Sequence, residues 1–271
     1  MAEFSSRSIG EREILYARLD DLCNGAVKGV MGSSCFLSPR DLHYAREYIS
    51  RTHANVGFIE WGGYGDAERK KIFLLPEYME GVESYSQLVE YGFEDELGAL
   101  EIIGSGYKKL SHRDFLGSVL GLGLERSVIG DIFLSEGEDS RVRATLICER
   151  KIAPFICDTL IKVASDTVRT KIIELCDIEP PERRFVHISD TVASARLDCV
   201  VSSLLSLSRE KAKSAVEAGL CEVDHETCER ADRMLTAPCT VSVRGYGRFR
   251  VNSLSDKTKK GRLRLDADKY V

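Results

Sequence analysis

Two adjacent prolines, Pro180 and Pro181, stand between Glu179 and Glu182. Proline lacks a backbone N–H and restricts the residue before it, so neither a helix nor a central strand can run through this segment. With 271 residues, the chain is long enough for one large domain or a few small ones. We therefore predict a domain boundary at residues 179–182.

Charge differs on the two sides of this boundary. Residues 182–271 hold 17 Lys and Arg against 13 Asp and Glu, a net charge of +4, whereas the remaining 21 and 30 give −9. The whole chain carries −5. A basic C-terminal part beside an acidic N-terminal part indicates that the former meets a polyanion.

Several protein classes are excluded or disfavoured. We find no apolar run approaching the roughly 18 residues of a membrane span, and no secretory signal in residues 1–20. The nine cysteines follow no regular spacing, which predicts reduced thiols in the cytoplasm. Cys221, His225, Cys228 and Cys239 match no paired zinc-knuckle spacing, so we expect no metal and no cofactor.

The N-terminal part contains the pattern L-S-x-R-D twice, at residues 37–41 and 110–114. Each copy precedes a helix–strand–strand run, which suggests an internal repeat. Ser38 and Ser111 are good helix N-caps, with an aspartate three residues later. Strands are expected near 56–61, 71–75, 129–134 and 142–148, and a first helix within 1–34. A closing helix is expected over 153–175, either continuous or broken near Ser165.

The C-terminal part predicts two short helices, residues 196–205 and 209–218. Gly219 ends the second helix, where left-handed geometry is favoured. Strands are expected at 220–223 and 240–244, and residues 252–271 form either a final strand or a loose basic tail.

The second helix carries the most informative side chains. Arg209 and Lys213 are four residues apart and share a helix face, and Lys211 flanks them. Ser208 and the first amides of the helix would meet a phosphate together with the bidentate Arg209 guanidinium, and Arg196 could complete the patch. The alternative is a solvated helix face balanced by glutamates. Phosphate binding requires Arg196, Arg209 and Lys213 to share one surface, free of internal ion pairs.

Residues 192–251 resemble an S4 RNA-binding domain. The resemblance is carried by ARLD (195–198), LSREKAK (207–213), AGL (218–220), Val223 and VSVR (241–244). It implies an αL-type module that docks on the phosphates of structured RNA through Arg196, Ser208, Arg209 and Lys213. Asp224-His225 replaces the Asn-Gly usual in that family, which leaves the type of this turn open.

Most of the chain resembles the YlmH family. The matching runs are GGYGDAERK (62–70), LEI (100–102), KLSHRDFLGSVLGLG (109–123), IGDI (129–132) and GYGRF (245–249). The resemblance implies an RRM-like N-terminal region and a C-terminal S4 domain. Members are implicated in ribosome-associated quality control on large subunits carrying obstructed peptidyl-tRNA, with an older, indirect link to cell division.

We therefore expect an α+β protein with an RRM-like N-terminal α/β region, suggested to be duplicated, followed by a small αL-type S4 domain. The expected parts are residues 1–80 (an α/β subdomain), 81–180 (an RRM-like subdomain), 183–251 (the S4 domain) and 252–271 (a basic C-terminal segment). Further RNA contacts are expected at Arg244, Arg248, Lys109, His112 and Arg113. The loop at 62–65, with Trp61 and Tyr64, is either a base-stacking loop or part of the core.

The expected function is a non-catalytic, monomeric factor that binds ribosomal RNA and tRNA on the large ribosomal subunit, with no catalytic residues, no small-molecule substrate and no membrane contact. No Ser/His/Asp or Cys/His nucleophile set suggests itself. Two alternatives stay open. One is an RNA-modifying enzyme of pseudouridine synthase or methyltransferase type with an appended S4 domain, and the other is a cell-division scaffold.

Overall fold

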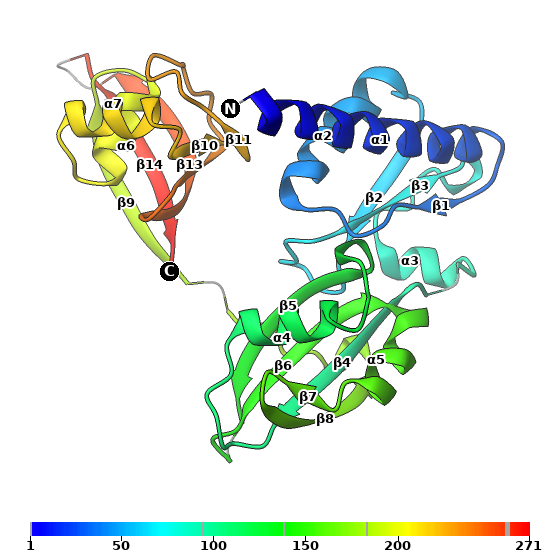
Figure 1. Ribbon diagram of the computed structural model, residues 1–271. Helices are drawn as coiled ribbons and strands as arrows, with labels where there is room; N and C mark the ends of the chain where they lie inside the picture. The colour runs from blue at the N-terminus through cyan, green and yellow to red at the C-terminus, as the bar shows by residue number, and fades with distance from the viewer. Residues whose placement is uncertain (1, 94, 138, 183, 258–260) are drawn as a thin grey trace. The chain divides into compact units, whose positions relative to one another are not determined.

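The computed structural model describes residues 2–93, 95–137, 139–182, 184–257 and 261–271. The chain divides into two compact units, Met1–Pro181 (unit 1) and Glu182–Val271 (unit 2), and the division falls directly after the proline pair. Both combine helices with antiparallel sheets, so the predicted α+β class is confirmed (Figure 1). In the described part of the chain, no helix has the length and apolarity to cross a bilayer.

Unit 1 begins with two helices on a three-stranded antiparallel sheet. The helices are α1 (Ala2–Val27) and α2 (Pro39–Thr52), and the sheet order is β1 (Gly32–Ser33), β3 (Lys71–Leu75) and β2 (Gly57–Trp61). Ser38 caps α2 by accepting a hydrogen bond from the Asp41 N–H at 3.2 Å, as its sequence position predicts. Leu19, Ile49 and Leu74 pack together in the core between helices and sheet.

A second, five-stranded antiparallel sheet follows in the order β5-β6-β4-β8-β7. Its elements are β4 (Leu97–Gly104), α4 (His112–Leu120), β5 (Ile129–Glu136), β6 (Val142–Glu149), α5 (Ala153–Thr159), β7 (Lys162–Val163) and β8 (Asp166–Ile173). The short helix α3 (Tyr85–Glu90) precedes it, and 3₁₀ turns lie at Glu77–Met79, Arg126–Val128, Arg150–Ile152 and Leu175–Asp177. Apart from the two-residue β7, the connectivity is β-α-β-β-α-β, with α4 and α5 on one face (Figure 1).

The predicted closing helix over 153–175 is wrong beyond Thr159. Residues 166–173 form β8 instead, which pairs antiparallel with β4 from Gly104↔Val168 to Ala99↔Ile173. Its composition explains the difference, because β-branched residues dominate it and burial alternates at its start, as at Val168 (buried) and Arg169 (exposed).

The loop at 62–65 packs inside unit 1. Gly63 has φ +99°, and a Cβ there would lie 2.9 Å from Ile147 Cδ1. The Trp61 ring lies 6.3 Å from that of Tyr85, and the Tyr64 hydroxyl donates to Asp131 at 2.9 Å. The two partly buried rings therefore pack against the core shared by the two sheets of unit 1, as the core interpretation of this loop predicts.

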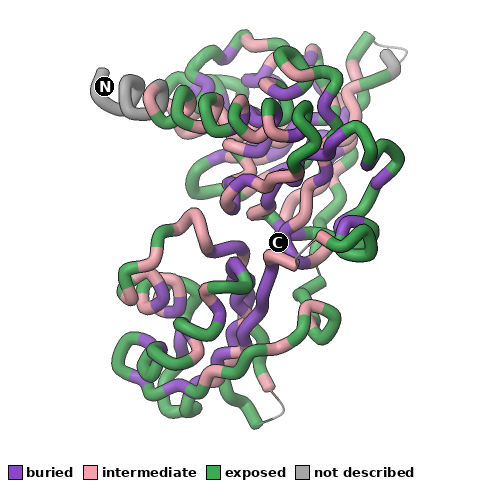
Figure 2. The backbone as a smooth tube through the Cα atoms, turned by 90° about the vertical axis from the view of Figure 1, so that its right-hand side faces the viewer, coloured by how far each residue is buried: buried purple, intermediate pink, exposed green. Residues whose placement is uncertain are grey.

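Unit 2 is a six-stranded antiparallel sheet, in the order β11-β10-β12-β13-β14-β9, with two helices packed on one face. The elements are β9 (Phe185–Val192), α6 (Leu197–Leu204), α7 (Arg209–Glu217), β10 (Cys221–Val223), β11 (Glu226–Thr227), β12 (Cys239–Val243), β13 (Gly247–Lys257) and β14 (Leu263–Tyr270). Val200, Val216 and Phe249 are fully buried in the core between helices and sheet. Figure 2 shows the backbone coloured by burial, with buried and exposed stretches alternating along the chain. Of the expected tail, residues 252–257 belong to β13 and residues 263–270 form β14, whereas residues 258–260 lie outside the described residues.

The turn at Asp224-His225 joins β10 to β11 in a two-residue hairpin. Both residues have positive φ, +50° and +68°, as a type I′ turn requires. The Asp224 carboxylate also accepts a hydrogen bond from the Thr240 N–H at 2.8 Å. The replacement of Asn-Gly by Asp-His therefore leaves a tight hairpin in place.

Candidate nucleic-acid interface

The corner between α6 and α7 is held by hydrogen bonds in both directions. The Ser202 hydroxyl donates to the Leu207 carbonyl at 2.7 Å, and the Leu207 N–H donates to the Ser202 carbonyl at 3.0 Å. Ser208 then caps α7, since its hydroxyl oxygen accepts from the Lys211 N–H at 3.3 Å. The first-turn N–H groups of a helix lack intrahelical partners, and Ser208 and Arg209 are exposed, so this end of α7 can receive an anion.

Asp198, in the first turn of α6, binds two arginines. Arg196 donates from Nε and Nη2 to its two carboxylate oxygens, each at 3.1 Å, and Arg209 donates from Nε at 3.3 Å. The carboxylate is buried, with 3% of its side chain exposed, whereas the Arg196 and Arg209 side chains are 37% and 57% exposed. One buried acid therefore brings two half-exposed guanidinium groups from different helices together.

The protonation of Asp198 depends on these partners. Burial by itself raises the pKa of the carboxyl, but hydrogen bonds from Arg196 and Cys199 and the charges of both arginines outweigh burial. The net result is a pKa below the ordinary value for aspartate. Asp198 is thus ionised at neutral pH and keeps both arginines in place.

The lysines of α7 lie apart from this acid. Lys211 and Lys213 are both exposed, and the Lys213 ammonium lies 3.6 Å from a Glu217 carboxylate oxygen. The sequence hypothesis required Arg196, Arg209 and Lys213 to be free of internal ion pairs, and all three have one, so the hypothesis fails in that form. The arginines do share one acid, however, and the Lys213 pair is an exposed one of the kind that contributes little stability.

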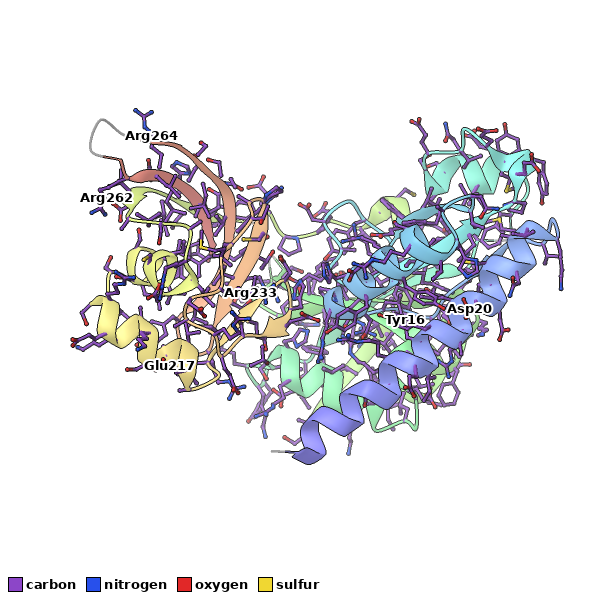
Figure 3. All side chains as sticks on the ribbon, turned by 90° about the horizontal axis from the view of Figure 1, so that it is seen from above. Tyr16, Asp20, Glu217, Arg233, Arg262 and Arg264 are labelled. Carbon is purple, nitrogen blue, oxygen red and sulfur yellow. The ribbon has the colours of Figure 1, made fainter. Side chains whose placement is uncertain are left out.

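A groove of about 320 Å³ runs beside the corner, between α6 and the end of β9. Arg209 lines it together with Arg262, which precedes β14 and donates from Nε to the Thr191 hydroxyl at 3.1 Å. Three serines of α6 and the corner add hydroxyl groups: Ser202, Ser203 and Ser206. Figure 3 shows Arg262 near Arg264 at one end of unit 2. The sequence reasoning missed Arg262, because only the β9–β14 pairing brings it here.

The other predicted contacts lie elsewhere. Arg248 is on β13 next to the core residue Phe249, so it projects from the sheet face opposite the helices, and its guanidinium lies 5.8 Å from the Tyr270 ring centroid. Arg244 is exposed in the β12–β13 turn. Lys109, His112 and Arg113 belong to unit 1 and are exposed at the start of α4.

The start of α4 differs from that of α7 in one respect. The Asp114 carboxylate accepts a hydrogen bond from the Ser111 N–H at 2.8 Å and another from the Ser111 hydroxyl at 2.6 Å. Asp114 therefore already accepts capping hydrogen bonds at this helix N-terminus, whereas Glu210 in the first turn of α7 makes none among the described residues, so the start of α4 is the weaker anion site.

The cysteines of unit 2 are buried thiols. Burial raises the pKa of Cys221 and of Cys239 to about 11. Among the described residues, no cluster of three or more His, Cys, Asp or Glu is arranged to hold a metal ion.

The chain is similar to a family model and to a characterised relative. A family model described as the putative RNA-binding domain in YlmH matches residues 95–177. The chain is also 31% identical over 230 residues to ribosome-associated protein quality control protein P2 of Bacillus subtilis (strain 168), a match covering 85% of this chain and 84% of that protein. The chain belongs to the YlmH family. In this YlmH-family protein, the residues matched by the family model run from just before β4 to the end of the 3₁₀ turn Leu175–Asp177.

A solved structure is similar as well. The cell division protein ylmH from Streptococcus pneumoniae is 19% identical to this YlmH-family protein, with a TM-score of 0.45, and the match covers 60% of this chain and 94% of that one.

Proposed function

We propose that the protein is a non-catalytic RNA-binding factor that holds structured ribosomal RNA and tRNA on the large ribosomal subunit, in the rescue or quality control of stalled peptidyl-tRNA complexes. The observation that carries the proposal is the arginine pair on Asp198 beside the Ser208-capped start of α7. Arg196, Ser208, Arg209, Lys211 and Lys213 are the primary contacts in this proposal.

The physical case begins with charge. Asp198 neutralises one of the two arginines, so the three groups keep a net positive charge at the protein surface. Because Arg209 uses only its Nε toward Asp198 in the described structure, its two terminal nitrogens remain to grip a phosphate in bidentate fashion. The α7 amides and the Ser208 hydroxyl lie at the same helix end, where the dipole favours an anion.

Holding both arginines in place also favours binding. An arginine side chain that is already oriented loses less conformational entropy when it binds. We therefore interpret Asp198 as a positioning residue, which explains why an acid stands within an otherwise phosphate-binding motif.

Two observations support a role in RNA binding on the ribosome. The strand order β8-β4-β6-β5 with two helices on one face is the arrangement expected of an RRM-like domain, and it spans the residues matched by the YlmH RNA-binding model. The Bacillus subtilis relative is named for ribosome-associated quality control. We interpret unit 2 as the S4 domain, extended by β14, and the protein as a cytoplasmic monomer whose task needs binding and positioning but no bond chemistry. Further contacts in the proposal are Arg244, Arg248, Lys109, His112 and Arg113.

Co-sedimentation tests this function. Purified large ribosomal subunits carrying peptidyl-tRNA are centrifuged through sucrose with the wild-type chain, with Arg209→Ala, and with the control Arg230→Ala, which removes an exposed arginine of unit 2 from outside the site. We expect wild type and control to pellet with the subunits and Arg209→Ala to remain largely in the supernatant. Failure of the wild-type chain to pellet, or equal pelleting of all three proteins, would refute the proposal.

A further inference from the structure

The five-stranded sheet of unit 1 has one face without helices. Strand pairing places residues in rows across this face, since directly paired residues of antiparallel strands point to the same side. The helix side carries Leu100, Ile102 and Leu146, which pack with α4 and α5. The residues that alternate with them along β4, β6 and β8 therefore form the opposite face.

One end of this opposite face is covered. The row Ile147, Ala99 and Ile173 lies there, and Gly63 packs directly on Ile147. Leu175 packs with the same cluster. This end belongs to the core of unit 1 and is closed to a ligand.

The other end is open and basic. The next two rows are Thr145–Glu101–Lys171 and Arg143–Ile103–Arg169. Arg169 and Lys171 are exposed, and Arg143 keeps 33% of its side chain exposed. The two rows thus hold three cations and one acid, Glu101, in a unit whose overall charge is −9. We call Arg143, Arg169 and Lys171 the basic band.

The ion pairs leave most of this charge uncompensated. Arg143 donates from Nη1 to Glu101 at 3.1 Å, and its Nη2 lies 3.8 Å from an Asp139 oxygen, while its buried Nε has no hydrogen-bond partner among the described atoms. Arg169 and Lys171 have no ion pair with any residue that the structure describes. Two exposed cations on neighbouring rows of one strand, beside a half-buried third, form a surface that attracts a polyanion.

The chemistry of the two rows restricts the ligand. Their members are aliphatic, hydroxyl or charged; the aromatic ring that extends the first row, Phe133, is 8% exposed and packs in the core. Nucleic-acid bases bind to protein sheets largely by stacking on exposed aromatic side chains. The open rows provide no such ring, whereas arginine and lysine side chains bind phosphate regardless of base sequence.

We propose that the basic band binds the sugar–phosphate backbone of RNA and is a second RNA contact surface, separate from the α6–α7 corner. The inference rests on the proposed RNA-binding function and adds a phosphate-reading, sequence-independent surface to it. RNA is favoured over an acidic protein segment because this sheet is the part of the chain that matches the YlmH RNA-binding model.

The test uses the full chain and fluorescein-labelled RNA hairpins with U-rich and A-rich loops. Affinity is measured over a range of salt concentrations for wild type, Arg169→Glu/Lys171→Glu, and the control Lys28→Glu/Arg51→Glu, which makes the same charge change at exposed positions of α2 and the α1–β1 loop. We expect the first double variant to raise Kd about tenfold for both hairpins and to reduce the slope of log K against log salt by about two. The control should change Kd less than about twofold.

Two further variants distinguish a failure of the basic band from a failure of the proposed RNA-binding function. The variant Arg169→Lys/Lys171→Arg keeps both charges, so its Kd should stay within about twofold of the wild-type Kd. The variant Arg209→Ala/Lys213→Ala measures how much the α6–α7 corner contributes to RNA affinity. If that last variant weakens binding while Arg169→Glu/Lys171→Glu does not, the basic band is refuted and the proposed function stands. If loss is confined to one loop sequence, phosphate recognition is refuted. If an acidic polypeptide, poly-glutamate, binds the wild-type chain more tightly than either hairpin does, the ligand is an acidic protein segment instead.

Discussion

The Nε of Arg209 lies 3.3 Å from a carboxylate oxygen of Asp198, which stands eleven residues earlier in the chain. This contact joins the first turns of α6 and α7. Because Arg196 binds the same carboxylate, both arginines depend on an acid that is almost completely buried. Asp198 therefore fixes the positions of both arginine side chains.

Replacing Asp198 should lower the stability of the protein. Asp198→Asn removes the charge that balances two arginines, and we expect the free energy of unfolding to fall by about 1–3 kcal/mol. Urea denaturation measures this change. Asp232→Asn is the matched control, since Asp232 forms an exposed pair with Arg230 at 3.6 Å and should change stability by less than about 1 kcal/mol. Equal effects of the two substitutions would contradict the role of Asp198.

The same carboxylate should make stability depend on pH. The pKa of Asp198 is lowered in the folded protein, so its contribution is present above the unfolded value of about 4 and is lost as pH falls through the lower, folded pKa. We expect the wild-type chain to lose stability in this acidic range. Asp198→Asn should lose less over the same range in urea titrations, and parallel curves for the two proteins would argue against this assignment.

Gly63 should tolerate no side chain. It combines φ +99° with a close approach to Ile147, so Gly63→Ala should destabilise unit 1 by about 1–3 kcal/mol. Gly65, two residues along the same loop, has open space where a Cβ would lie, and Gly65→Ala should stay within about 1 kcal/mol of wild type. Thermal unfolding of both variants checks the packing of the loop, and a neutral Gly63→Ala would show that it is loose.

Thiol reactivity should follow burial. Burial raises the pKa of Cys23 to about 11 and of Cys148 to about 12, whereas Cys176 is exposed. We expect iodoacetamide at neutral pH to modify Cys176 first, with Cys23 and Cys148 protected until the chain unfolds. Peptide mass spectrometry over a time course measures the order, and early labelling of Cys148 would contradict the fold around β6.

Local patterns predicted the α6–α7 pair well. Ser208 caps α7 and Gly219 follows its end with φ +68°, both readable from neighbouring residues. The role of Asp198 was not readable in this way, because it depends on how α6 packs against α7. Arg262 was missed for the same reason, since a strand pairing distant in sequence places it by the groove.

In unit 1, local patterns were ambiguous. Residues 166–173 lie in a segment whose apolar residues also fit helical spacing, and only the pairing with β4 selects the strand. Trp61 and Tyr64, at and beside the loop 62–65, could serve either stacking or packing, and both rings pack, partly buried, against the core that the two sheets share. Contacts between distant segments decided both cases.

The contact between the start of α7 and an RNA backbone can be observed directly by NMR. We would titrate the ¹⁵N-labelled full chain with an RNA hairpin and follow the backbone amides of Ser208, Arg209 and Glu210 together with the Arg196 and Arg209 Nε–H signals. Within unit 2, we expect these signals to show the largest chemical-shift changes and to show them at the lowest RNA concentrations. If they stay unmoved while other surfaces of unit 2 respond, RNA binds elsewhere and the proposed interface is wrong.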